Sequence, residues 1–192
     1  MVLRKVNLHV HSNFSDGLNS IEQIANKAIK LGLEYICITD HLSNSWKSNI
    51  IPTLDNSTKI SDYLRKISNI NSQLEHNDIN LRILKGVEID IGSDMNYIIR
   101  LINPKKFDLI LFEYLESYDG IAFISNLINY WRIHSNRKFE LAIFGLAHLD
   151  PSYFYYSNFH QIVDLFTEND LIYEFNTSYP HSYSSKYQSL FQ

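Results

Sequence analysis

The chain has 192 residues, of which 45% are hydrophobic and 20% are charged, so we expect one globular domain and exclude both a disordered protein and a membrane span. The formal net charge of -4, without a long basic run, argues against binding of nucleic acid through bulk electrostatics and leaves nucleic acid only as a substrate. Cys37 is the only cysteine, which excludes an internal disulfide and zinc sites built from cysteine pairs, so any metal must be held by His, Asp and Glu.

The first predicted strand carries two histidines and leads into a polar turn. Because successive side chains of a strand point to opposite faces, His9 and His11 project from the same face. Gly17 lets the chain fold back, so the carboxylate of Asp16 can rejoin the two imidazoles as an oxygen ligand. The pattern predicts half of a metal site, although two solvated histidines on an edge strand would give the same spacing.

A helix and a second strand follow, and this strand ends in another pair of polar residues. Ser20 can cap a helix over residues 21–31, and the apolar run after it predicts a strand over residues 33–41. The carboxyl ends of parallel strands converge, so Asp40 and His41 are expected near the first histidine pair. We favour metal ligation there over the alternative, a hydrogen-bonded core pair of histidine and carboxylate.

The centre of the chain predicts a long loop, a helix and a third strand. Residues 42–57 are polar and are expected to cover the mouth of the site, because loops of this length are commonly functional. A helix is predicted over about residues 57–76, with His76 on the surface. The next strand, residues 81–90, places Glu88 near its carboxyl end, where a carboxylate is costly unless it is paired or coordinated.

Three further predicted strands each carry a histidine or a carboxylate near their carboxyl ends. They are residues 107–116 with Glu113, residues 141–148 with His148, and residues 171–177 with Glu174 and Asn176 on one face. Helices are predicted before them, near residues 95–102, 121–134 and 159–168. An apolar strand, a polar residue at its end and a helix thus recur, which predicts an α/β fold with a parallel barrel or strongly curved sheet. The strand ends would form one pocket.

Five short motifs occur in a characteristic order along almost the whole chain. They are H-x-H-S-x-x-S-D-G at residues 9–17, T-D-H at 39–41, G-V-E at 86–88, the strand-ending His148 and E-F-N-T at 174–177. This order resembles the PHP (polymerase and histidinol phosphatase) domain superfamily, and its stand-alone histidinol-phosphatase-like members most closely. The resemblance implies a distorted parallel (β/α)7-type barrel, a metal cluster at its carboxyl face that is often trinuclear, and hydrolysis of phosphate esters.

The resemblance also implies roles for individual residues. Six residues match family metal ligands: His9, His11, Asp16, His41, Glu88 and His148. It implies two or three divalent ions, Zn, Mn or Fe, with Glu88 as the carboxylate that bridges two of them. Asp40 is expected to orient His41 and raise its basicity. The proton for the leaving group is expected from His41, His148 or a water molecule.

The chain departs from the family pattern in the fourth strand. The register in which the family usually has a histidine falls on Leu115, which cannot bind metal. Glu113 lies two residues earlier, on the same predicted face, and is a candidate substitute ligand that would favour Mn or Mg over Zn. The alternative is that Glu113 is a solvated or salt-bridged residue.

The second departure concerns the last strand. The family ends with a strand that carries D-x-H, and residues 178–192 contain no such strand, so we expect a barrel without its last strand, from a fragment or a natural short form. His181 is a late histidine within reach of the pocket, although a surface turn beside Pro180 is the favoured interpretation. An open barrel would expose a parallel edge, so a homodimer formed through that edge is a hypothesis.

The sequence therefore predicts a metal-dependent phosphoric monoester hydrolase for a small phosphorylated substrate, with histidinol phosphate as the first candidate. Lys47 and Lys85 are the basic residues nearest the motifs, and this scarcity favours a small substrate over a polyanionic strand. Two alternatives stay open: a PHP-type nuclease that acts on nucleic-acid ends, and a catalytically impaired PHP domain that serves as a binding module. No apolar run of signal-peptide length occurs near Met1, so a cytoplasmic location is expected.

Overall fold

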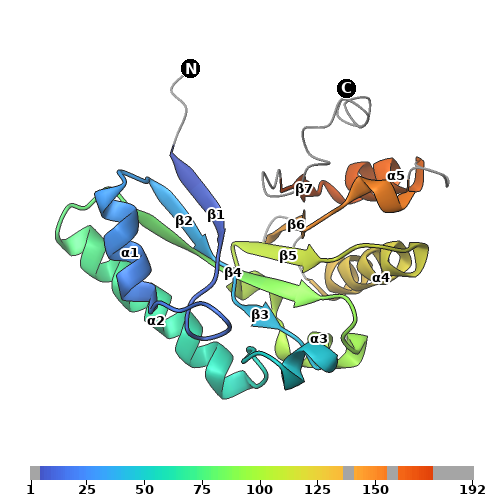
Figure 1. Cartoon of the computed structure of the whole chain (residues 1–192), viewed down its shortest axis with the longest axis horizontal. Helices are drawn as coiled ribbons and strands as arrows, with labels where there is room; N and C mark the ends of the chain where they lie inside the picture. Colours follow the sequence, from blue (N-terminus) through green and yellow to red (C-terminus); the bar gives the residue numbers. More distant parts are fainter. Residues whose placement is uncertain (1–4, 136–140, 155–159, 175–192) are drawn as a thin grey trace.

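Strands and helices alternate along the chain in the computed structural model, which describes residues 5–135, 141–154 and 160–174 (Figure 1). The strands are β1 (Val6–Val10), β2 (Tyr35–Ile38), β3 (His41–Leu42), β4 (Arg82–Asp90), β5 (Leu109–Glu113), β6 (Ile143–Ala147) and β7 (Ile172–Tyr173). The helices are α1 (Ile21–Lys30), α2 (Ser57–His76), α3 (Met95–Leu101), α4 (Tyr118–His134) and α5 (His160–Asn169). Short 3-10 helices cover Trp46–Asn49, Pro104–Lys106 and Pro151–Phe154.

All strand pairs in the described part of the chain are parallel. The order along the sheet is β1-β2-β4-β5-β6-β7, and β3 pairs with β4 further along that strand than β2 does. The sheet is curled into a half-barrel, which confirms the predicted α/β class with a strongly curved parallel sheet (Figure 1). The predicted strand over residues 33–41 is divided into β2 and β3, because Thr39 and Asp40 leave the ladder between them.

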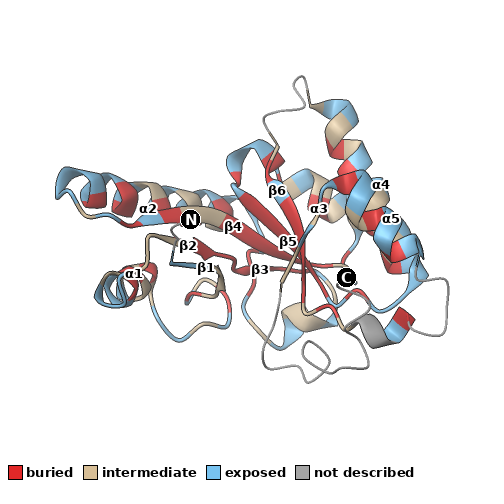
Figure 2. Cartoon of the chain, turned by 90° about the horizontal axis from the view of Figure 1, so that it is seen from above, coloured by how far each residue is buried: buried red, intermediate tan, exposed pale blue. Residues whose placement is uncertain are grey.

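The helices form by the local rules that their sequences suggest. Ser20 and Gln23 form a capping box at the start of α1, so two backbone donors that the helix leaves unpaired are satisfied. In α2 the buried positions recur three or four residues apart, and this face packs on β4. The helices lie outside the buried strands, with α1 and α2 near β2 and β4, and α4 and α5 near β5 and β6 (Figures 1 and 2). None of the described helices is both long and apolar enough to cross a membrane.

Close strand packing at Gly86 helps to bring the carboxyl ends of the strands together. A Cβ atom at this position of β4 would lie 2.6 Å from Cys37 Sγ and from the Ile38 carbonyl oxygen, so a larger residue would push β4 away from β2. The hydroxyl of the fully buried Tyr63 from α2 lies 2.6 Å from the same Ile38 oxygen and 2.9 Å from the Gly86 carbonyl oxygen, so it contacts both strands. Since every strand runs the same way, the polar residues at the strand ends face one common mouth.

Candidate metal centre

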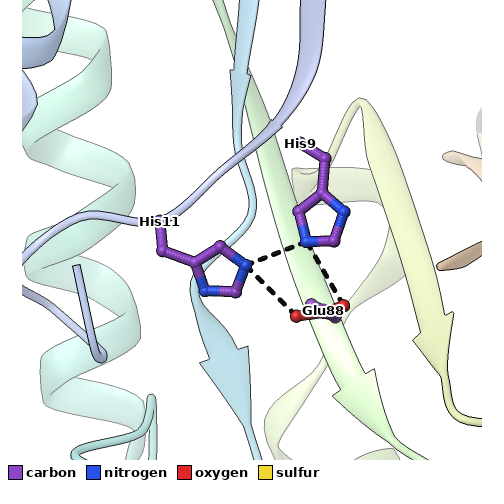
Figure 3. Close-up of side chains that lie close together, drawn as sticks. All are labelled: His9, His11 and Glu88. Carbon is purple, nitrogen blue, oxygen red and sulfur yellow. Dashed lines mark hydrogen bonds and ion pairs between the residues drawn. The ribbon is translucent and has the colours of Figure 1, made fainter. Parts of the chain in front are cut away.

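The two histidines of the first motif lie side by side over a buried carboxylate from a different strand. His9 is on β1 and His11 follows it by two residues, and their Nε2 atoms are 2.8 Å apart. Glu88 on β4 approaches both rings from below (Figure 3). Its Oε1 is 3.3 Å from His9 Nε2, and its Oε2 is 3.3 Å from His11 Nε2. The strand alternation that predicted this pair is therefore confirmed.

Two more predicted ligands approach the same carboxylate from other strands. His41 on β3 places Nδ1 3.0 Å from Glu88 Oε2, because His41 and Glu88 are directly paired in the ladder between β3 and β4. His148, which follows β6, places Nε2 3.3 Å from Glu88 Oε1. Four imidazoles from three separated parts of the chain thus surround one fully buried carboxylate.

Asp16 occupies the open side of the cluster. Its Oδ1 is 3.0 Å from His11 Nδ1 and its Oδ2 is 3.6 Å from His41 Nε2, and 42% of its side chain is exposed. The loop returns this closely because Gly17 has no side chain: a Cβ atom there would lie 2.3 Å from the His11 carbonyl oxygen. The glycine of the first motif is thus required by a close approach of the backbone.

The donor set fits divalent metal ions. Both oxygens of Glu88, and the Nδ1 atoms of His11 and His41, are buried without a hydrogen-bond partner, although nitrogen and oxygen atoms face one another at 3.0–3.3 Å. Buried polar atoms are normally hydrogen-bonded, so lone pairs that converge without donors between them indicate a place for cations. Imidazole and carboxylate groups suit Zn, Mn and Fe. Four overlapping groups of three ligand atoms lie within 4.8 Å of one another: His9, His11, Glu88; His9, His148, Glu174; His11, Asp16, His41; and His41, Glu88, Glu113.

Protons hold part of the cluster together when metal is absent. Burial alone would lower the pKa of His9, but its hydrogen bond to Glu174 and its close contact with the Glu88 carboxylate outweigh burial and raise this pKa to about 10. For His11 burial prevails and lowers the pKa. Burial would raise the pKa of Glu88, but the contacts with His148 and His9 lower it, so this carboxylate stays ionised. The metal-free site therefore pairs a buried anion with a protonated imidazole, and a metal ion must displace that proton.

Asp40 does not have the role that the sequence suggested. It was expected to orient His41, but its fully buried carboxylate faces the first loop. Oδ1 accepts hydrogen bonds from the Ser12 backbone N–H at 2.8 Å and from the Ser15 hydroxyl at 2.5 Å, and Oδ2 accepts one from the Ser12 hydroxyl at 2.5 Å. The expectation failed because the loop folds back over the end of β2 and supplies three donors. Asp40 thus positions the loop that carries His11 and Asp16.

Glu113 and Leu115, which were predicted to share one face of the strand over residues 107–116, lie in different surroundings. Glu113 ends β5 and Leu115 was expected on the same face, but Tyr114 between them has a left-handed backbone with φ of 57°. This conformation breaks the strand alternation, so Leu115 packs in the hydrophobic core. Glu113 is fully buried, which excludes the solvated alternative, and its Oε2 pairs with Lys47 Nζ, which confirms the salt-bridged alternative. Its Oε1 is 3.3 Å from His41 Nδ1.

Glu174 is a site residue that was not included among the predicted ligands. Its Oε1 is 2.9 Å from His9 Nδ1, and its Oε2 accepts a hydrogen bond of 3.1 Å from the backbone N–H of His148. A partner on the far ring nitrogen fixes the orientation and tautomer of a metal-binding histidine. The contact also joins the two edges of the half-barrel, β1 and the end of β7. The signal was available in the E-F-N-T motif, whereas Asn176 and His181 lie outside the described residues.

A cavity of about 790 Å³ opens beside the cluster. Its wall includes three aromatic side chains, Trp46, Tyr114 and Phe123, and the acidic residues Asp90, Glu116 and Asp119. Two lining residues connect it to the cluster: Lys47 pairs with Glu113, and the Tyr114 ring stacks on the His148 ring with centroids 5.2 Å apart. The cavity therefore adjoins the cluster, and it could hold the part of a substrate that does not bind to metal.

Comparisons with known proteins agree with this arrangement. A sequence model of the PHP domain family matches residues 7–178. Over 90 residues the chain is 38% identical to the DNA polymerase/3'-5' exonuclease PolX of Bacillus subtilis, a match that covers 47% of this chain but only 14% of PolX. A solved structure from Listeria monocytogenes, provisionally assigned as the histidinol phosphatase hisK, aligns with a TM-score of 0.56 at 17% identity.

The structural match covers 90% of this chain and 82% of the Listeria protein, and at this identity it concerns the fold alone. It confirms the distorted barrel type that the resemblance implied. The six predicted ligands lie together, whereas their binding of metal stays a prediction. The family match extends over most of the sequence and includes the strand ends that build the cluster. The chain belongs to the PHP domain family.

Proposed function

We propose that this protein is a metal-dependent phosphoesterase that hydrolyses a small phosphomonoester. The observation that carries the proposal is the environment of Glu88, a fully buried carboxylate whose two oxygens face four imidazoles at 3.0–3.3 Å. A carboxylate in such a place is costly unless cations compensate it. Membership of the PHP domain family supports the same reaction class.

Bound divalent ions would supply a Lewis acid that polarises the phosphate oxygens and lowers the pKa of a bound water. The protein would hold them through both oxygens of Glu88, since each oxygen faces a different pair of histidines. Glu174 would keep the His9 ring in position from behind. Asp16 would complete the ligand set on the solvent side of the cluster.

Among the predicted proton donors, His148 is better placed than His41. The His148 side chain is 20% exposed and lies beside Tyr114 of the cavity, whereas His41 is 7% exposed and faces three carboxylates. A donor to the leaving alkoxide has to reach the substrate, which favours the more open imidazole. Asp40 would act indirectly, through the loop that it holds.

The chemistry of the cavity supports a small substrate that carries a cationic group. Carboxylates in its wall would repel a polyanionic strand and attract an amine, and the aromatic side chains suit a flat or apolar group. Histidinol phosphate has an ammonium and an imidazole on the alcohol side, so it remains the first candidate. The name of the PolX relative keeps a nuclease as the second candidate.

A screen of phosphomonoesters beside single-stranded DNA tests both candidates. We expect Mn²⁺-dependent release of phosphate, with histidinol phosphate faster than glycerol phosphate, and loss of activity after chelation. The variant His9→Ala/His11→Ala should lose bound metal and activity, whereas His76→Ala, at the exposed end of α2, should keep both. Activity that survives the double change would refute the proposal. A folded wild type with at most one ion and no hydrolysis would favour the binding module instead.

A further inference from the structure

We propose that the ammonium group of Lys47 occupies the place of one metal cation, so that this chain holds two ions and a built-in positive charge. The inference rests on the proposed metal-dependent function and concerns the group formed by His41, Glu88 and Glu113, whose ligand atoms lie within 4.8 Å of one another. Among the described residues, this group contacts a lysine through Glu113, whose Oε2 pairs with Lys47 Nζ.

The negative charge of the Glu113 side chain is already compensated by the ammonium group of Lys47. Glu113 is fully buried, and a buried carboxylate without a compensating charge would be strongly destabilising. Lys47 Nζ lies 2.5 Å from its Oε2, and the Lys47 side chain is only 12% exposed. The other oxygen, Oε1, is 3.3 Å from His41 Nδ1. A metal ion at this group would therefore have to compete with an ammonium that is held against the same carboxylate.

Lys47 is fixed in this position by the loop that carries it. Asp90 lies two residues after Glu88 on β4, on the same face, and its carboxylate accepts hydrogen bonds from the hydroxyls of Ser43 and Ser45. Ser45 in turn caps the 3-10 helix, because its hydroxyl accepts a hydrogen bond from the backbone N–H of Lys47. The ion pair is thus built into the scaffold and is not a chance contact of a mobile surface lysine.

The surroundings of the ammonium suit a lysine better than a third metal ion. The ring of Tyr114 lies 4.9 Å from Lys47 Nζ, a distance at which an aromatic face attracts a cation. Leu115, which follows Tyr114, packs in the core and offers no ligand. Without Lys47, the remaining ligands would be one imidazole and two carboxylates, and Glu88 already faces the other histidines.

Metal stoichiometry tests the inference directly. Wild type and variants are equilibrated with excess Mn²⁺, passed through gel filtration and measured by elemental analysis, with circular dichroism to verify folding. We expect two ions per chain in the wild type and three in Lys47→Met, which removes the charge and shortens the side chain by one atom. Lys47→Arg should keep two ions, because the charge is retained. Lys47→Gln provides a second uncharged variant if the methionine variant does not fold.

Two further variants separate the site effect from a general charge effect. Lys47→Met/Glu113→Gln should return to two ions, because the carboxylate that holds the third ion is gone. Lys66→Met, on the surface where it pairs with Glu22, should also keep two. Three ions in the wild type, or two in both uncharged Lys47 variants, would overturn the inference and leave the proposed function standing. A wild type without metal would overturn both.

Discussion

Replacing Asp40 by asparagine tests how the buried carboxylate positions the first loop. Its oxygens accept three hydrogen bonds from Ser12 and Ser15, and both serines are buried. A hydrogen bond to a charged group contributes roughly 1.5–3 kcal/mol and a neutral one roughly 0.5–1.5 kcal/mol. Because the asparagine amide has only one acceptor oxygen, at most two of the three bonds persist in weakened form and the third is lost, which lowers the free energy of unfolding by about 3 kcal/mol. Asp40→Ala leaves the three donors without an acceptor and should cost more than about 4 kcal/mol.

Urea denaturation of the chelator-treated protein measures this change without a contribution from bound metal. With an m value of about 2 kcal/mol/M, Asp40→Asn should lower the midpoint by about 1.5 M. Asp62→Asn is the matched control, because Asp62 forms an exposed ion pair with Arg65 and should change stability by less than about 1 kcal/mol. Equal midpoints for the two variants would refute this account of Asp40. So would a Ser12→Ala/Ser15→Ala variant as stable as the wild type.

Three other predictions concern the metal centre. Glu88→Gln should bind at least one ion fewer than the wild type and lose its Mn²⁺-dependent thermal stabilisation, and an unchanged metal content by elemental analysis would contradict this. Since the pKa of His9 is raised to about 10, His9 is protonated at pH 7 without metal. Metal binding should therefore release its proton and tighten as the pH rises from 6 to 9; calorimetry in two buffers of different ionisation enthalpy measures the release, and equal heats would refute it. Gly17→Ala should destabilise the protein by about 3 kcal/mol and weaken metal binding, because its Cβ would meet the His11 carbonyl. Gly32→Ala has open space and a positive φ, so it should cost only about 1 kcal/mol, and the reverse order in urea denaturation would refute the argument.

The sequence predicted the curved sheet and the meeting of the ligands because both follow from local periodicity and parallel pairing. His9 and His11 share a face by strand alternation, and Glu88 reaches them because the carboxyl ends of neighbouring strands lie together. The sequence also predicted where α1 begins, because the capping residue Ser20 and its partner Gln23 are only three positions apart. These features depend on short-range periodicity within each element and on the parallel direction of neighbouring strands.

The features that the sequence did not predict depend on loop conformation and on distant partners. Leu115 was assigned to the face of Glu113, and the left-handed backbone of Tyr114 that separates them has no signature in its side chain. The contact of Lys47 with Glu113 joins residues 66 positions apart, through a loop whose path Asp90 determines. A pattern of residue types cannot specify such a path.

An anomalous diffraction map of crystals grown with Mn²⁺ tests the central claim most directly. We expect two peaks within coordination distance of the cluster around Glu88, and no peak between Glu113 and Lys47. A folded protein with no peak near Glu88 would contradict the claim that histidines and carboxylates from separate strands form a metal centre.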